Sequence, residues 1–307
     1  MHMTSKSHAV CSDLAVLIPS RGRAVELAAT YRSIRRQALL PAQVVFAVTN
    51  ESDIVQVDRE SGEIDFCYHQ SGKTAQLNAG IRKLRPEITL VAIMDDDVEL
   101  SKEYLRIVRK IFGEHQDLVG LDGHLLANGG VDRQEALDLV NAYDGNSPRS
   151  PDSDFAIRWY PSDKGLYGCC MTIRREVFNH IQFDERLPMY SWMDDADIGI
   201  RAQRFGKCAY SPNACMAHLA VKSGRDSGIR FGFAQIMNPF YLGSTGVFQW
   251  STVLKNHVLK AVAANLFGVM RRDKSVDRLG RLRGNWIALS NLVKGRIEPE
   301  LIREIRG

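Results

Sequence analysis

Residues 88–97 read ITLVAIMDDD, an apolar run that passes directly into three adjacent aspartates, Asp95, Asp96 and Asp97. The apolar run is typical of a strand buried in a sheet. Three neighbouring carboxylates repel one another, and a divalent cation held by oxygen ligands relieves that repulsion. The stretch therefore predicts a metal or phosphate-metal site at the end of a buried strand. A solvated acidic turn that caps the following helix is the alternative.

Strand-like and helix-like segments alternate around this acidic stretch. The runs LAVLI (residues 14–18) and VVFAV (residues 44–48) have the length and composition of buried strands. Apolar residues recur at helical spacing after the first run and again before Pro86, and Ser101 stands where it can cap a further helix. Repeated β-α-β units predict an α/β fold with a mostly parallel sheet, whose ligands bind at the carboxyl ends of the strands.

The second half of the chain is less regular in sequence. Residues 128–163 are polar and rich in turn-forming residues, which predicts a long loop. Regular structure is expected to return with a strand over 168–173, a helix over 174–181 and a helix over 194–205 that Gly206 ends. These segments extend the α/β pattern beyond the loop.

The composition is that of an ordinary globular protein of 307 residues, 45% of them hydrophobic and 25% charged. These values exclude a collagen-like, low-complexity or disordered chain. No apolar run is long enough to span a bilayer, and the polar opening MHMTSKSH lacks the apolar core of a secretory signal, so we expect a cytoplasmic location. The six cysteines form no CxxC pair and lie in or beside apolar runs, which favours buried, reduced thiols over disulfides or a zinc site.

Positive charge is concentrated near the end of the chain. The net charge is only +4, but residues 255–296 contain ten basic and two acidic residues. Apolar residues recur at near-helical spacing from Trp250 to Met270. This pattern predicts a helix within residues 250–296 that lies on an anionic membrane surface; a helix packed on the rest of the protein is the alternative. Aromatic residues are not interleaved with the basic ones, which argues against nucleic-acid binding.

Five motifs in sequence order resemble the family-two inverting glycosyltransferases of the GT-A fold. They are VLIPSRGR (residues 16–23), GKTAQLNAG (72–80), MDDD (94–97), a G…RR.VF stretch from Gly168 to Phe178, and MDDADIGIR (193–201). The resemblance spans residues 14–225 and implies a Rossmann-like, mostly parallel nucleotide-binding sheet with a helical C-terminal extension. The chain then divides into a disordered or tag-like N-terminus (1–12), a GT-A glycosyltransferase domain (13–245) and a basic amphipathic helical extension (246–307).

This resemblance implies a nucleotide-sugar donor and a Mn²⁺ or Mg²⁺ ion. Asp97 is the implied metal ligand, and His218, which lies in an apolar run, is either a second ligand or a core residue. Thr49 stands where family members often carry the aspartate that binds the base, so UDP-sugars and GDP-sugars are both open. The residues implied to bind the donor are Pro19, Ser20, Arg21, Arg23, Thr49, Asn50, Lys73, Asn78, Asp95 and Asp96.

The same resemblance implies that an acceptor hydroxyl attacks the anomeric carbon opposite the nucleotide while a carboxylate takes the hydroxyl proton. Asp195, at the second position of the acidic pair, is the implied base, and Asp194 is its rival. Gly168, Trp192 and Asp194 are expected to contact a saccharide or lipid-linked acceptor. Two other classes stay open: a nucleotidyltransferase that acts on a sugar phosphate, and a non-catalytic protein that binds a membrane surface. For the enzyme, we expect peripheral attachment to the inner face of the membrane.

Overall fold

The computed structural model describes residues 9–57, 64–146, 155–221, 227–273 and 276–306. The described strands are β1 (Ala9–Pro19), β2 (Leu39–Val48), β3 (Ile64–Tyr68), β4 (Leu90–Met94), β5 (Val98–Leu100), β6 (Leu118–Asn128), β7 (Arg158–Trp159), β8 (Cys170–Arg174) and β9 (Lys207–His218). They form one nine-stranded sheet in the order β3-β2-β1-β4-β8-β6-β9-β5, with β7 paired to β9. The long pairings of β1 with β2 and of β6 with β9 are parallel, whereas β8 runs antiparallel to β4 and β6. The sheet is therefore mixed and mostly parallel.

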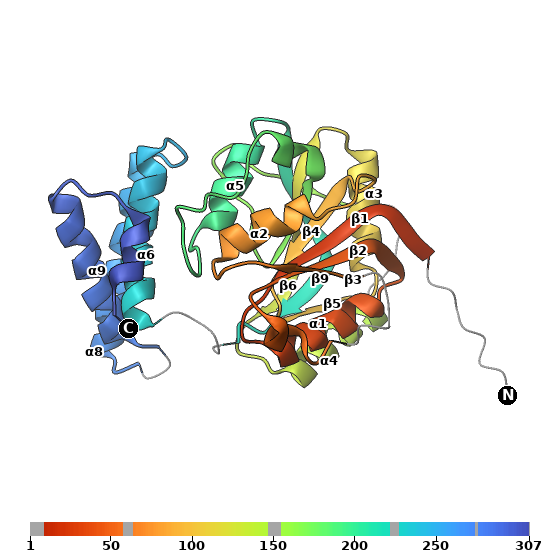
Figure 1. Ribbon diagram of the computed structural model, residues 1–307, viewed down its shortest axis with the longest axis horizontal. Helices are drawn as coiled ribbons and strands as arrows, with labels where there is room; N and C mark the ends of the chain where they lie inside the picture. The colour runs from red at the N-terminus through yellow and green to blue at the C-terminus, as the bar shows by residue number, and fades with distance from the viewer. Residues whose placement is uncertain (1–8, 58–63, 147–154, 222–226, 274–275, 307) are drawn as a thin grey trace.

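Helices cover both faces of this sheet (Figure 1). Side chains of β1 alternate between two apolar clusters, with Leu14 and Val16 in the first and Leu17 in the second. Residues of α1 and α3 complete the first cluster, and residues of α2 and α5 complete the second. These helices are α1 (Ala24–Arg35), α2 (Lys73–Arg82), α3 (Tyr104–Glu114) and α5 (Asp194–Ala202). The predicted α/β architecture is confirmed.

The C-terminal helices form a separate layer beside the sheet (Figure 1). They are α6 (Gly228–Ser244), α7 (Trp250–Thr252), η3 (Val253–Leu259), α8 (Lys260–Met270), α9 (Arg278–Val293) and η4 (Pro299–Glu304). The α7, η3 and α8 segments follow one another without a break, and η3 is π-helical. Helices α6 and α9 cross so closely that a Cβ atom on Gly284 would lie 1.9 Å from the Ile229 carbonyl oxygen. Thus α6, on the GT-A side of the boundary predicted from sequence, packs against a helix of the predicted extension.

Residues 128–163 differ from the predicted loop. They contain the helix α4 (Arg133–Asn146) and the short strand β7, while residues 147–154 lie outside the described residues. Helix α4 buries Ala136 and Val140 in a small cluster with Ala217 of β9. Ala136 and Val140 are the buried residues among the described side chains of α4, and they gain these contacts only when β9 lies beside the helix.

The predicted helices over 174–181 and 194–205 are both shorter in the structure, and helix α3 has a different cap from the one predicted. The segment after β8 is a short 3₁₀ helix, η2 (Arg175–Asn179), and α5 ends at Ala202. The Ser101 hydroxyl does not cap α3, because it is buried and bonds none of the described groups. Instead, the side-chain oxygen of Gln37 accepts a hydrogen bond from the Leu105 N–H at 3.0 Å. A residue distant in sequence therefore provides the cap.

The N-terminal segment differs from its prediction, whereas the cysteines agree with theirs. Residue Ala9 already pairs with Leu39 of β2, so β1 extends into the N-terminal segment predicted to lie outside the fold. All six cysteines are buried and free, as the sequence predicts. Among the described helices, none combines the length and the apolar character needed to cross a membrane.

Candidate active site

The three aspartates lie in the tight turn between β4 and β5, and they face two directions. Asp96 accepts hydrogen bonds from Ser20 Oγ at 2.5 Å and from Arg23 Nη1 at 2.9 Å. Burial raises the pKa of Asp96 to about 6, although the positive charge of Arg23 opposes this shift. Asp95 and Asp97 face His218, and Asp97 Oδ2 also lies 3.5 Å from Arg23 Nη1. The acidic stretch thus divides into one carboxylate that ties the β1 loop to the turn and two that point at a histidine.

Asp95, Asp97 and His218 each bring a potential ligand atom within 4.8 Å of the others. His218 ends β9, and the antiparallel pairing of β5 with β9 places it opposite Val98. Its Nε2 atom lies 3.2 Å from Asp97 Oδ1 and 3.6 Å from Asp95 Oδ2. Sheet register therefore joins two residues of the acidic turn to a side chain more than a hundred positions away in sequence.

Asn128 determines which nitrogen of His218 carries the proton. The amide nitrogen of Asn128 donates to the Tyr167 hydroxyl at 2.8 Å, so its oxygen faces His218 Nδ1, 2.9 Å away. An amide oxygen only accepts, so Nδ1 holds the proton and Nε2 of the neutral ring has a lone pair. Asp97 Oδ1, next to that lone pair, is buried and accepts no hydrogen bond from the described residues. Two carboxylates and an imidazole converging in this way fit a Mn²⁺ or Mg²⁺ ion.

Lys73 links this cluster to the acidic pair that begins α5. Its Nζ atom lies 3.3 Å from Asp95 Oδ1 and 3.8 Å from Asp194 Oδ2. Burial works against the charged amine, but Asp194 and Asp95 raise the pKa of Lys73 well above its usual value. The lysine is therefore a fixed positive charge at the centre of the site.

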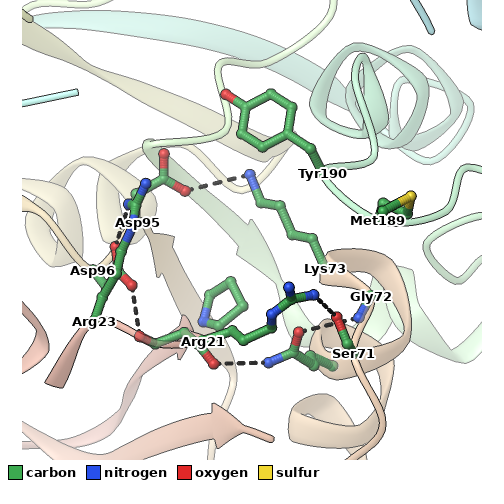
Figure 2. A pocket seen from close by; sticks show the side chains of 12 residues that line it. Arg21, Arg23, Ser71, Gly72, Lys73, Asp95, Asp96, Met189 and Tyr190 are labelled. Atoms are coloured by element: carbon green, nitrogen blue, oxygen red, sulfur yellow. Dashed lines mark hydrogen bonds and ion pairs between the residues drawn. The ribbon is translucent and has the colours of Figure 1, made fainter. Parts of the chain in front are cut away.

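A cleft of about 120 Å³ opens beside the acidic turn, and Figure 2 shows Arg21, Arg23, Lys73 and Asp95 around it. Arg21 Nη1 donates to Ser71 Oγ across one wall. Most of the residues predicted to bind the donor line this cleft: Pro19, Ser20, Arg21, Arg23, Lys73, Asp95 and Asp96. The structure thus gathers basic side chains and the acidic turn around one opening.

A second cavity, of about 460 Å³, adjoins the cleft and shares Lys73, Asp95 and Tyr190 with it. The residues predicted for the acceptor side line this cavity, together with the histidine: Gly168, Trp192, Asp194, Asp195 and His218. The C-terminal region completes the lining with four residues that the sequence analysis did not single out: Phe248, Thr252, Asn256 and His257. The cavity therefore lies between the sheet domain and the C-terminal helices.

Asp194 and Asp195 have different environments although they are neighbours in α5. Both oxygens of Asp195 accept backbone hydrogen bonds, Oδ2 from Gly168 N and Oδ1 from Ala196 N, each at 2.8 Å. Asp194 Oδ2 is buried and accepts no hydrogen bond from the described residues. Burial raises the pKa of Asp194 to about 7; the negative charges of Asp195 and Asp95 add to this shift, and Lys73 opposes it. Asp195 is thus the carboxylate held by two backbone hydrogen bonds, and Asp194 is a buried carboxylate with a raised pKa.

The segment that precedes this pair is held in strained backbone conformations. Met189, Ser191 and Met193 have φ angles of +62°, +56° and +76°, in the left-handed region that non-glycine residues rarely adopt. The intervening side chains, Tyr190 and Trp192, line the second cavity. Strain of this kind concentrates at functional sites, where the surrounding structure stabilises it.

The sequence profile of Glycosyl transferase family 2 matches residues 15–182 of the chain. The chain belongs to this family. No match was found among the curated proteins. The chain is similar in fold to the mannosyltransferase PcManGT from Pyrobaculum calidifontis in complex with GDP-Man and Mn²⁺, with a TM-score of 0.51 and 15% identity over 95% of this chain and 92% of that one. TarS of S. aureus is also similar, with a TM-score of 0.48 and 15% identity over 75% of this chain and 40% of that one, so the chain spans two fifths of TarS.

Three of the residues predicted to bind the donor do not line the cleft beside the acidic turn. Asn78 lies five positions after Lys73, which turns it to another side of α2. Its amide nitrogen donates to the Phe183 carbonyl oxygen and to Glu185 Oε1, both at 2.9 Å. Asn78 therefore joins α2 to the chain before α5. Gln76, which the sequence analysis did not single out, lines the cleft and donates to the Ser20 carbonyl oxygen at 3.0 Å.

Thr49 and Asn50 lie beside a buried aspartate at the end of β2. Asp53 Oδ2 accepts from Thr49 Oγ1 at 2.7 Å and from the Asn50 N–H at 3.2 Å, while Oδ1 accepts from the Gly22 N–H at 2.6 Å. Burial opposes ionisation, but these donors lower the pKa of Asp53. This loop therefore has a carboxylate of its own, Asp53, which ties it to the β1 loop. The roles of Thr49 and Asn50 in binding a base stay predictions.

Asp122 of β6 is a further site residue that the sequence analysis did not identify. It accepts hydrogen bonds from the Tyr167 N–H at 3.0 Å and from the Tyr160 hydroxyl at 2.9 Å. Burial raises the pKa of Asp122 to about 7. Tyr167 precedes Gly168, whose N–H holds Asp195, so Asp122 orients the turn that orients the acidic pair. A single aspartate in the otherwise uncharged LVGLDG run is the sequence signal that points to it.

Proposed function

We propose that this chain is a metal-dependent, inverting glycosyltransferase that moves a sugar from a nucleotide-sugar donor to a hydroxyl of a saccharide or lipid-linked acceptor. One observation carries the proposal: two adjoining cavities share Lys73 and Asp95, Asp95 forms a cluster with Asp97 and His218, and Asp195 lines the second cavity. One cavity has the cationic and acidic groups that a diphosphate requires. The other holds an oriented carboxylate, which is what an attacking hydroxyl requires.

The donor side of the proposal rests on the cleft. Arg21, Arg23 and Lys73 supply positive charge, and Asp95, Asp97 and His218 would hold the cation. When bound, the cation supplies charge that stabilises the negative charge developing on the diphosphate. PcManGT holds GDP-Man and Mn²⁺ on a similar fold, so this pair is the first to test. UDP-sugars remain the second set.

On the acceptor side, the chain's own residues accomplish the proton transfer. The backbone N–H groups of Gly168 and Ala196 hold the Asp195 carboxylate toward the second cavity. The acceptor oxygen forms a bond to the anomeric carbon as the bond from that carbon to the diphosphate oxygen breaks, and Asp195 takes the hydroxyl proton. A positioned carboxylate contributes about 10²–10⁴-fold to such a step. Attack from the side opposite the leaving group inverts the configuration.

Calorimetry of nucleoside diphosphates with Mn²⁺ tests the metal and donor assignment. Asp97→Asn should abolish metal-dependent binding, because the amide keeps the shape of the side chain and removes one charged ligand. Asp138→Asn, which changes an exposed carboxylate of α4, is the matched control and should bind as the wild type does. Equal affinity in the Asp97 variant would contradict the assignment.

The reaction class has its own test. Incubation with nucleotide sugars should release the nucleoside diphosphate, and the new glycosidic bond should have the anomeric configuration opposite to that of the donor. Release of pyrophosphate from a nucleoside triphosphate and a sugar phosphate would instead identify a nucleotidyltransferase. Retention of configuration in the product would contradict the single displacement.

A further inference from the structure

The helix made of α7, η3 and α8 exposes an apolar face. Leu259, Phe267 and Met270 are 62%, 52% and 72% exposed. Of the nineteen exposed large hydrophobic residues in the described chain, ten lie between Trp250 and Val293. Soluble monomers rarely gather exposed apolar side chains in this way, and such patches mark protein or membrane contacts.

The charge along this helix shows which kind of contact it fits. Residues 250–272 contain four basic residues, all exposed, and no acidic residue; they are Lys255, Lys260, Arg271 and Arg272. Arg271 lies over the Phe267 ring, 4.1 Å from its centre. A second copy of the chain docked on this face would bring like charges together. An anionic bilayer offers opposite charge to the basic groups and an apolar layer to the exposed side chains.

The helix that carries these exposed side chains also reaches the second cavity. Thr252 and Asn256, near the start of the helix, line that cavity. Ala263, Phe267 and Met270 line a separate apolar groove further along. Within α8 these three positions are spaced by four and three residues, so they share one side of that helix. One unbroken helix therefore connects the exposed apolar groove with the wall of the cavity.

We infer that the helix over residues 250–270 lies in the interface of an anionic bilayer and that the acceptor is lipid-linked and enters the second cavity from the membrane. The docking part stands on the exposed apolar and basic side chains alone. The acceptor part rests on the proposed function, because it needs the second cavity to be the acceptor site. The helix is therefore both a membrane anchor and one wall of the entrance for the acceptor.

Co-sedimentation of the full chain with vesicles tests the docking. The probes are vesicles of phosphatidylcholine with and without phosphatidylglycerol, at low and high salt. The chain should sediment with the anionic vesicles and be released by salt. Each basic residue near an anionic surface is worth about a fivefold change in binding, so Lys255→Gln/Lys260→Gln should weaken binding by roughly 30-fold.

A second pair of variants tests the apolar side chains. Phe267→Ser/Met270→Ser should also lose vesicle binding, because the remaining charges alone do not insert. The matched control, Val10→Ser/Val55→Ser, removes two residues that are 62% and 67% exposed in the sheet domain, and it should bind vesicles as the wild type does. Metal-dependent binding of the nucleoside diphosphate should be unchanged in all three pairs, which shows that they are folded.

A fluorescent label tests the acceptor entrance. All six native cysteines are buried, so a cysteine placed at Asn256 or Ala263 can be labelled selectively with an environment-sensitive dye. Both positions should move to an apolar environment when anionic vesicles are added. A shift at Ala263 without one at Asn256 would overturn the entry of the acceptor from the membrane.

Three results would overturn the docking. They are a wild-type chain that stays in the supernatant with anionic vesicles, a Phe267→Ser/Met270→Ser variant that still binds, and a concentration-dependent dimer that this variant abolishes, which would identify a second copy as the occupant. A chain that binds vesicles but transfers no sugar would contradict the proposed function and leave the docking standing.

Discussion

Asp122→Asn should change how the stability of the protein depends on pH. In the folded chain, burial raises the pKa of Asp122 from 3.8 to about 7. Between these values the unfolded chain has lost the proton and the folded chain keeps it, so folding takes up a proton and the free energy of unfolding falls as pH rises. The stabilisation is complete below the unfolded pKa and is lost by the time pH passes the folded pKa. Asparagine keeps both contacts, since its oxygen accepts from the Tyr167 N–H and its amide donates to the Tyr160 hydroxyl.

The size of the effect follows from the shift. Each pH unit between the two pKa values costs about 1.4 kcal/mol, so the free energy of unfolding of Asp122→Asn relative to the wild type should rise by about 3 kcal/mol between pH 5 and pH 8. Urea denaturation at the two pH values measures it. The exposed Asp138→Asn control should differ from the wild type by less than about 0.5 kcal/mol at either pH. A relative change under about 1 kcal/mol for the Asp122 variant would refute the reasoning.

Three further outcomes are expected. Asp195→Asn should lower turnover by about 10² or more without weakening donor binding, whereas Asp194→Asn should do less; the reverse order in a steady-state assay would make Asp194 the base. Asn128→Ala should weaken Mn²⁺ binding about 10–100-fold by releasing the His218 ring, and calorimetry that shows unchanged affinity would count against His218 as a ligand. Gly284→Ala should lower the free energy of unfolding by about 1–3 kcal/mol because its Cβ would meet the α6 backbone. The control is Gly113→Ala, whose Cβ would meet only the flexible end of the Arg109 side chain. Equal melting temperatures for the two variants would contradict the packing argument.

Local pattern in the sequence was enough to predict the sheet and the edge at which the site lies. An apolar run that ends in acids describes a buried strand and a polar loop within a few adjacent residues, so no distant contact is needed to recognise it. The roles of Lys73 at the start of α2 and of the acidic pair at the start of α5 were implied instead by the resemblance to the glycosyltransferase family. Asp95, Asp97 and His218 were all singled out from sequence, and the structure places them together.

Tertiary structure alone decided which partner each of the site side chains contacts. The sequence could not show that Asp96 turns to Arg23 while Asp95 turns to His218, because that choice depends on the fold of the β4–β5 turn. Nor could it show that Asn128 sets the histidine proton or that Asn256 lines the second cavity, because those contacts join segments far apart in the chain. Periodicity records which face of an element is buried, but not which partner covers that face. The partner is chosen by sheet register and helix packing, and these form only when the whole chain folds.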